Sequence, residues 1–320
     1  QTENGITAIL PIQNLLTKER EYQLKLQLDT EAAGPVYYYT RILWTDAQEH
    51  ARAMVDLAAD FSMKTFDYEQ ARSLTTYLES SPAEDNTTFG HTSIHSSFSQ
   101  LTWGKLGMQP EEPVEIRLKE LDGVMCGIQL SYRAKRQDEE GTETYEVEED
   151  FTMKWNELRI YMMQYDRTVN QIFAGDRSEF SGKRILLGIT GDDRIELVKS
   201  AGGRVSVFRV DRDLWSYEPG ARRAVQIFSF RDDDSTDVRC NYDHHDVKIL
   251  SVEDSGDVDF LVYGYMNRGN HEGENGIAGY HYSAGDNALE ERYFIPYSGS
   301  YEQLAADLNQ LASQTSGGML

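Results

Sequence analysis

The densest group of residues that could do chemistry lies in the last quarter of the chain. Residues 243–246 read Asp-His-His-Asp, and a second polar run follows at residues 267–274. Imidazole and carboxylate groups are good ligands for zinc or manganese, and two paired strands could bring the runs together. A divalent metal site would be built from Asp243, His245, His271 and Glu272. We nevertheless expect no cofactor, with a metal as the alternative, because adjacent histidines on a strand point to opposite faces and no HExxH pair occurs.

The run at residues 263–269 is the most unusual short segment, with two tyrosines, two glycines and an Asn-Arg-Gly sequence. Its pattern predicts a strand that enters a tight turn with positive φ. An arginine there could hold a carboxylate as a fork, and the tyrosines could stack on a sugar. The candidate ligand-binding residues are Tyr263, Tyr265, Arg268 and Trp215. The simpler interpretation is a packed aromatic strand, with the arginine paired to one of the 54 acidic residues.

Motifs for catalysis are weak throughout the sequence. Several carboxylates lie near aromatic residues, and glycoside hydrolysis needs two acids about 5–10 Å apart, but a chain this acidic presents such pairs by chance. The sequence contains no G-x-S-x-G, no phosphate-binding Walker loop and no G-x-G-x-x-G. A carbohydrate-binding or glycan-hydrolysing domain would use aromatic residues beside two acids, from among Trp103, Trp155, Trp215 and Tyr265.

Composition excludes some classes of partner. The chain has 320 residues and a formal charge of −23, from 31 Lys and Arg against 54 Asp and Glu. This excess of acid disfavours nucleic acid and anionic lipid, because no basic surface is available to neutralise them. No apolar run approaches the roughly 18–20 residues of a membrane-spanning helix, so we expect no direct membrane insertion. The sequence leaves open whether its two cysteines, Cys126 and Cys240, are bonded.

The elements that must position these residues are mainly strands. Alternation predicts a hairpin of strands at 21–28 and 36–44. Two helices with apolar faces follow at 47–61 and 68–78, and the segment after them, at 86–103, has weak periodicity. Turn signals then separate a succession of strands before a last amphipathic helix at 301–311. These strands are expected at 114–120, 125–135, 143–152, 157–165, 183–189, 194–199, 204–210, 222–231, 245–253, 258–266, 276–283 and 289–295.

The expected fold class is α+β and β-dominated, with antiparallel meander sheets, two N-terminal helices and a C-terminal helix. Residues 183–231 and 247–296 each contain about four strands of similar layout. Partial β-propeller-like repeats in the C-terminal half are therefore the alternative, although two units do not close a ring of about 4–8 blades.

The segment Gln-Pro-Glu-Glu-Pro at residues 109–113 is the most linker-like part of the chain. It divides the chain into an N-terminal α+β domain at 1–112, formed by the hairpin and two helices, and an antiparallel β-rich domain at 113–320. Residues 174–183 are a second candidate linker.

Three stretches, at residues 205–215, 260–273 and 293–308, carry a resemblance to known proteins. The layout resembles ectodomains of large membrane-anchored proteins of Gram-positive bacteria. More distantly, the Tyr-rich and acidic α+β pattern is similar to the YycH/YycI extracytoplasmic regulators of a sensor histidine kinase. The resemblance matches no diagnostic motif, so it assigns no functional residue. It implies an anchored, non-catalytic role in regulation or scaffolding.

The leading hypothesis is therefore a non-enzymatic extracytoplasmic binding or regulatory module of a membrane-anchored protein, with a protein or cell-envelope partner. The chain begins at Gln1 without a signal-peptide layout, so we expect a piece of a longer protein, tethered by a segment outside these residues. The 19 tyrosines suit a contact surface, and the acidic charge favours solubility. The alternatives are the carbohydrate domain and a metal-dependent hydrolase.

Overall fold

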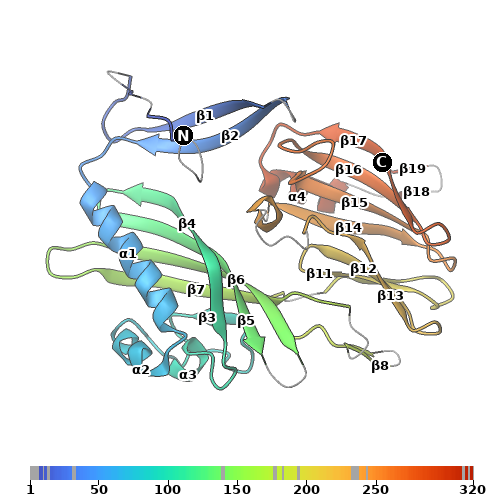
Figure 1. Cartoon of the computed structure of the whole chain (residues 1–320), viewed down its shortest axis with the longest axis horizontal. Helices are drawn as coiled ribbons and strands as arrows, with labels where there is room; N and C mark the ends of the chain where they lie inside the picture. Colours follow the sequence, from blue (N-terminus) through green and yellow to red (C-terminus); the bar gives the residue numbers. More distant parts are fainter. Residues whose placement is uncertain are drawn as a thin grey trace.

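The computed structural model describes residues 7–319 except for 10, 13–14, 31–33, 138–140, 176–178, 182–183, 193–194, 232–237, 243, 312–313 and 316–317. The first half, residues 48–171, is built on a five-stranded sheet, and the second half, residues 172–311, on two four-stranded sheets (Figure 1). A hairpin precedes both halves. The expected β-dominated α+β class, with antiparallel meanders and a C-terminal helix, is confirmed.

The sheet of the first half has the strand order β3-β7-β6-β5-β4, so its four long strands form a meander and a short strand joins the edge at β7. Helix α1 (Gln48–Lys64) lies across one face of this sheet (Figure 1). The other face carries polar side chains. The strands are β3 His91–Ser93, β4 Gln109–Asp122, β5 Met125–Gln137, β6 Thr142–Lys154 and β7 Tyr161–Gln171.

Regular apolar spacing explains why α1 packs on the sheet. Its buried residues include Met54, Ala58 and Phe61, which recur every three or four positions on one side of the helix. In β5 and β6 every second residue is buried, as expected for strands with one covered face. Complete burial of a side chain such as Met54 or Phe61 contributes about 1.5–3 kcal/mol. Three short helices complete this half: α2 Tyr68–Ala71, η1 Arg72–Thr76 and α3 Phe98–Leu101.

Two charged side chains, Glu149 and Arg167, lie inside this core and not on the polar face. They stand directly opposite one another in β6 and β7. The Arg167 guanidinium lies 3.6 Å from the centre of the Trp103 ring and donates to two backbone carbonyl oxygens of α3. Burial raises the pKa of Glu149, which accepts a hydrogen bond from the Tyr165 hydroxyl. Because Arg167 ties α3 to the sheet, we assign this group a structural role.

The second half contains two consecutive four-stranded meanders that share one core. Val207 and Leu214 of the first sheet pack in the same core as Phe260 and Val262 of the second. The repeated four-strand layout is therefore present, as two sheets. The strands are β10 Leu197–Lys199, β11 Ser206–Val210, β12 Asp213–Glu218 and β13 Arg223–Phe228, then β14 His245–Val252, β15 Val258–Tyr265, β16 Asn275–Ser283 and β17 Ala288–Pro296.

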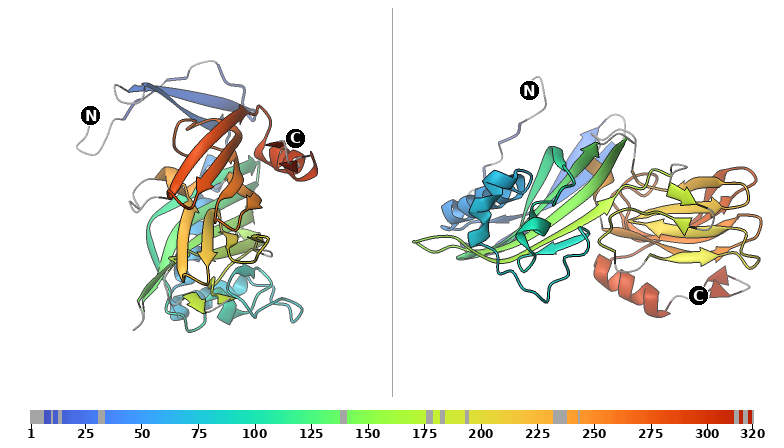
Figure 2. Two further views of the ribbon diagram at one scale, coloured as in Figure 1. Left: turned by 90° about the vertical axis from the view of Figure 1, so that its right-hand side faces the viewer. Right: turned by 90° about the horizontal axis from the view of Figure 1, so that it is seen from below.

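The outer faces of both sheets in the second half are also covered. Helix α4 (Tyr301–Leu311) lies against the second half (Figure 2). Its Leu304 and Leu308 pack in one cluster with Leu261 of β15. On the other sheet, the segment that begins at Phe173 packs against Trp215. Two short strands lie in this segment, β8 Phe180–Ser181 and β9 Arg184–Ile185, and a 3-10 helix, η3 Val238–Asn241, precedes β14.

Strands β1 (Glu21–Thr30) and β2 (Gly34–Leu43) form a two-stranded hairpin that extends toward the second half (Figure 1). Arg41 fixes it to the first half by donating to the backbone oxygen of Lys119 over 2.7 Å. In the middle of β2, Tyr38 and Tyr39 add to the effects of burial and Glu272 that raise the pKa of Tyr265. A second small pair, β18 Gln314–Thr315 and β19 Gly318–Met319, follows α4.

Several elements differ from those that the sequence predicts. The linker expected at 109–113 lies inside β4, which is an edge strand of its sheet and so tolerates prolines that lack an N–H donor. A register shift between Glu111 and Glu115 accommodates Pro113. The chain leaves the first half after β7, beside the second candidate linker. Strand β12 was not expected, and the strand expected at 183–189 is reduced to β9.

None of the helices in the described part of the chain combines the length and the apolar character needed to cross a membrane.

Candidate functional site

A cleft of about 680 Å³ lies between the two halves. Its floor is the polar face of the five-stranded sheet, on the side opposite α1. Its wall is built from the second half, by the turn between β11 and β12, the start of β14 and the first residue of α4. The cleft therefore exists only when the two halves are assembled.

The register of the sheet places the floor residues in two rows. One row crosses β4, β5, β6 and β7 through Glu111, Arg133, Glu146 and Asn170. The row beside it runs through Glu115, Ser131, Glu148 and Thr168. All eight residues line the cleft. They share one face because they alternate with the buried residues that pack under α1.

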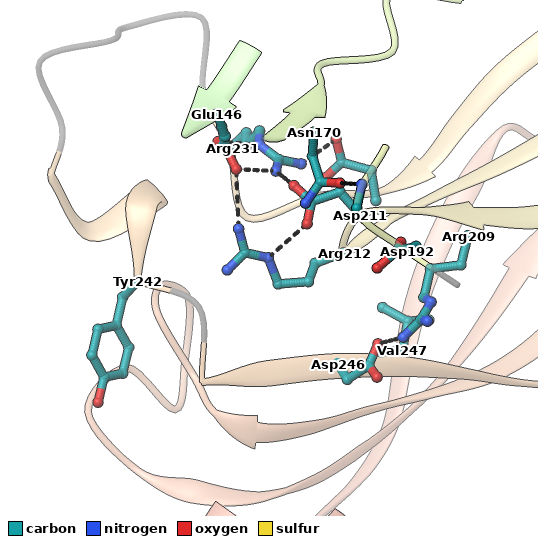
Figure 3. A network of polar contacts seen from close by, with 12 residues as sticks. Glu146, Asn170, Asp192, Arg209, Asp211, Arg212, Arg231, Tyr242, Asp246 and Val247 are labelled. Carbon is teal, nitrogen blue, oxygen red and sulfur yellow. Dashed lines mark hydrogen bonds and ion pairs between the residues drawn. The ribbon is translucent and has the colours of Figure 1, made fainter. Parts of the chain in front are cut away.

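Glu146 joins the two halves through a cluster of charged residues, which we call the clamp (Figure 3). Its two carboxylate oxygens accept from Nε and Nη2 of Arg231 over 2.9 and 2.7 Å, a bidentate pair. Arg212 donates to the same carboxylate over 3.1 Å. Arg231 also pairs with Asp211 and Asp213. The clamp is Glu146, Asp211, Arg212, Asp213 and Arg231.

Burial and opposite charge act against one another in the clamp. Burial opposes ionisation of Glu146, but Arg231 and Arg212 hold the pKa of this carboxyl well below its ordinary value. Burial raises the pKa of Asp211 to about 6 despite the same two arginines. Burial also opposes the charge of Arg231, but Glu146, Asp211 and Asp213 raise its pKa. Glu146 therefore remains ionised near neutral pH, and Arg231 remains a cation.

A second ion pair stands on the wall of the cleft, between Arg209 of β11 and Asp246 of β14 (Figure 3). Asp246 also accepts from the Tyr263 hydroxyl over 3.3 Å. The neighbouring His245 is 3% exposed, and its Nδ1 has no hydrogen-bond partner in the described structure. Burial and the charges of nearby arginines lower the pKa of His245 to about 3, so the ring is neutral.

Two carboxylates with pKa values pushed apart are a pattern seen in acid–base catalysis. In the clamp, however, both oxygens of Glu146 are already held by arginine donors, and Asp211 is paired to Arg231 and Arg212. Groups bound in this way are not directed at a substrate. The arrangement links the two halves of the molecule.

The predicted ligand-binding residues do not form one surface. Trp215 and Tyr263 are both buried, and they belong to cores on different sheets of the second half. Tyr265 is half-buried against Tyr242, with ring centres 4.8 Å apart. The Nη1 atom of Arg268 lies 3.6 Å from the Cys240 sulfur. A binding role for these residues stays a prediction.

The three described residues predicted to hold a metal do not form a metal-binding group. His245 lies on the cleft wall, His271 contacts Glu291 over 2.8 Å, and Glu272 pairs with an arginine. Asp243 lies outside the described residues. Across the described part of the chain, no group of three or more His, Cys, Asp or Glu side chains could hold a metal ion. Both cysteines are free thiols and are buried.

One set of residues has the types of a nucleophilic triad but the wrong order. The Ser251 hydroxyl donates to Asp259 over 3.0 Å, and His281 contacts the other oxygen of Asp259 over 2.7 Å. The carboxylate thus lies between serine and histidine. A catalytic triad needs the histidine beside the serine, because the ring must take the hydroxyl proton.

Sequence reasoning identified His245, Asp246 and Tyr263 but missed most of the charged residues of the cleft. In the sequence Arg231 precedes three aspartates, a run typical of a solvated turn, whereas its side chain is 11% exposed in the clamp. Glu146 follows the polar alternation of a half-buried strand, a pattern that normally indicates solvent. The available signal was the density of charge at residues 209–213, directly between two apolar strands.

The fold and the site define a β-rich α+β protein of two halves with a charged cleft between them. No protein-family model matches the chain, and no curated protein matches it either.

Proposed function

We propose that the protein is a non-enzymatic binding or regulatory module that receives a ligand, or a segment of a partner protein, in the cleft between its halves. The observation that carries this proposal is the cleft itself, at about 680 Å³ and lined by both halves. Ligand sites commonly have volumes of about 300–1,000 Å³ and lie at domain interfaces. An occupant that touches both halves would favour one relative position of them, which suits regulation.

Binding is a better account of the cleft than catalysis. The carboxylate with the most strongly lowered pKa, Glu146, is held by two arginines, and the buried His245 is neutral. Among the described residues of the cleft, these two strongly shifted groups are thus a carboxylate held by arginines and a buried neutral imidazole.

The proposed location is extracytoplasmic, within a membrane-anchored protein of the cell envelope. This part of the proposal rests on the resemblance to ectodomains of Gram-positive bacteria. A protein or envelope component is the proposed partner, and nucleic acid is disfavoured because the chain carries a charge of −23.

Photocrosslinking from the cleft floor in the native cell tests the proposal. A benzophenone amino acid replaces Ser131, which lies on the floor, and a matched protein carries it at Arg52, an exposed residue of α1 on the opposite side of the sheet. We expect a reproducible crosslinked envelope component from position 131 and none from position 52. Equal yields from both positions, or no product from either, would contradict the proposal.

A groove at the foot of the hairpin supports a second candidate function, carbohydrate binding. This groove of about 290 Å³ lies between β2, the start of α1 and β4. Trp44 lines it and is 55% exposed, and Glu21 and Glu120 line it as well. A flat exposed indole beside acidic acceptors can stack on the apolar face of a sugar and bind its hydroxyls.

Titration with soluble cell-wall oligosaccharides tests this second candidate. If the groove binds sugar, Trp44→Ala should weaken binding about tenfold, because the indole loses its buried apolar contact. Tyr68→Ala removes an equally exposed aromatic residue on α2 and should leave the affinity unchanged. Equal affinities of all three proteins would exclude this groove as a sugar site.

A further inference from the structure

Within the described part of the chain, Arg133 is the cation of the cleft lining that has no partner. It extends from β5 on the polar face and lines the cleft floor. Among the residues that the structure describes, it forms no ion pair, hydrogen bond or ring contact, and its buried Nε lacks an acceptor. A guanidinium in this position loses hydration without gaining hydrogen bonds, which costs free energy unless a ligand supplies an acceptor.

The two acidic neighbours of Arg133 are already paired to other cations. The register places Glu111 on one side of it and Glu146 on the other. Glu111 pairs with Lys135 over 3.0 Å, and Glu146 is held in the clamp. The donors of Arg133 thus remain available in the middle of the floor.

We infer that Arg133 binds a carboxylate of a short peptide segment lying in the cleft, an inference that rests on the proposed function. The planar guanidinium presents parallel N–H donors that match the two oxygens of a carboxylate. The hydroxyls of Ser131 and Thr168 lie in the adjacent row of the same face and can bind backbone amides of the peptide.

The charge of the cleft disfavours ligands that carry several negative charges. Eight carboxylates line it, against four arginine and lysine side chains. A ligand that carries several negative charges, such as a polyphosphate, would be repelled by this excess. A peptide combines one carboxylate with N–H donors or cationic groups that the remaining acids can accept. The volume of about 680 Å³ is large enough for a few residues.

Affinity selection from defined peptide pools tests the inference. The probes are four pools of tetrapeptides with random side chains, with the C-terminus either free or amidated, and with Asp and Glu either included or omitted. Each pool is incubated with the protein, separated by gel filtration and quantified by mass spectrometry. We expect the pools that contain a carboxylate to be enriched about tenfold or more over the amidated pool without Asp and Glu, because charge-assisted hydrogen bonds are strong. Enrichment of the free C-terminus alone identifies the terminal carboxylate, and enrichment of Asp and Glu pools identifies a side chain.

Substitutions then assign the effect to Arg133. Arg133→Gln should reduce the enrichment to about one, whereas Arg133→Lys should keep part of it because the charge remains without the fork. Arg52→Gln removes another arginine, on α1, and should match the wild type. None of these changes removes a described contact, and circular dichroism confirms that each variant is folded.

The outcomes separate this inference from the proposed function. Equal binding of all four pools, binding of none, or unchanged enrichment in Arg133→Gln would overturn the role of Arg133. If crosslinking from position 131 still succeeds in that case, the cleft binds its partner by other contacts. Failure of the crosslinking together with peptide selection would reject the cleft as a site for a partner in the cell.

Discussion

At the scale of single residues, the buried His245 should make the protein sensitive to acid. Its folded-state pKa of about 3 lies far below the ordinary value of about 6.5, so the unfolded chain takes up a proton first as the pH falls. The free energy of unfolding of the wild type, measured relative to that of His245→Gln, should therefore fall by about 2 kcal/mol between pH 7 and pH 5. Urea unfolding followed by circular dichroism at both pH values measures this difference.

Asp211 changes the free energy of unfolding with pH in the opposite direction, but this effect cancels when wild type and His245→Gln are compared. Its raised pKa of about 6 adds stability as the pH falls from 7 toward 4, and it is present in both proteins. His95→Gln removes an exposed histidine and serves as the control. A constant difference between wild type and His245→Gln from pH 7 to pH 5 would show that His245 titrates normally in the folded state.

Some residues of the cleft could be predicted from their types, and others could not. The cluster at 243–246 drew attention to His245 and Asp246, because adjacent histidines and carboxylates are chemically conspicuous. Arg133 and Glu146 each occupy a polar position in an alternating strand, where a side chain ordinarily faces water. They line a cleft because the second half lies against this face, and no local sequence pattern encodes that contact.

At the scale of elements, the hairpin β1–β2 should be less protected than the five-stranded sheet. A two-stranded hairpin is marginally stable alone, and Arg41 supplies a fixed link to β4. Amides of β1 and β2 should exchange with deuterium faster than those of β5 and β6. Arg41→Gln should accelerate exchange in the hairpin at least several-fold and leave β5 unchanged.

Hydrogen exchange read by mass spectrometry, with Arg52→Gln as the control, measures this effect. Uniform protection across the hairpin and β5 in both proteins would indicate that the hairpin is stabilised by contacts other than Arg41.

Strand patterns were more informative about elements than about their connections. The alternation at 21–28 and the apolar runs of β14 to β17 predicted strands close to their observed bounds. Strand β12 was missed because Asp213 lies at its start and is 3% exposed, so a charge that normally indicates a loop is buried there by Arg231. The prolines of β4 indicated a linker, but an edge strand accommodates them.

At the scale of the whole molecule, the clamp should determine whether the halves unfold together. Glu146→Gln leaves the buried Arg231 without its bidentate partner, and breaking a buried ion pair costs about 3–5 kcal/mol. We expect a single urea transition in the wild type and two transitions in the variant, monitored by tryptophan fluorescence and circular dichroism.

Glu143→Gln is the matched control, because Glu143 lies in the same strand and pairs with the partly exposed Arg136. Its cost should stay below about 1 kcal/mol, as for surface pairs. A single transition of unchanged midpoint in Glu146→Gln would mean that the halves are held together mainly by other contacts.

The position of the clamp in the chain also bears on how the protein is made. Glu146 and Arg231 are 85 residues apart, so a ribosome completes the whole first half before the second half can cover it. During that interval the face that will become the cleft floor is in water. That face carries charged and hydroxyl side chains, and the apolar side chains of the sheet are already covered by α1. The first half therefore exposes little apolar surface that could cause aggregation before the second half is made. We therefore expect the two halves to mature one after the other during synthesis, with docking as the last event.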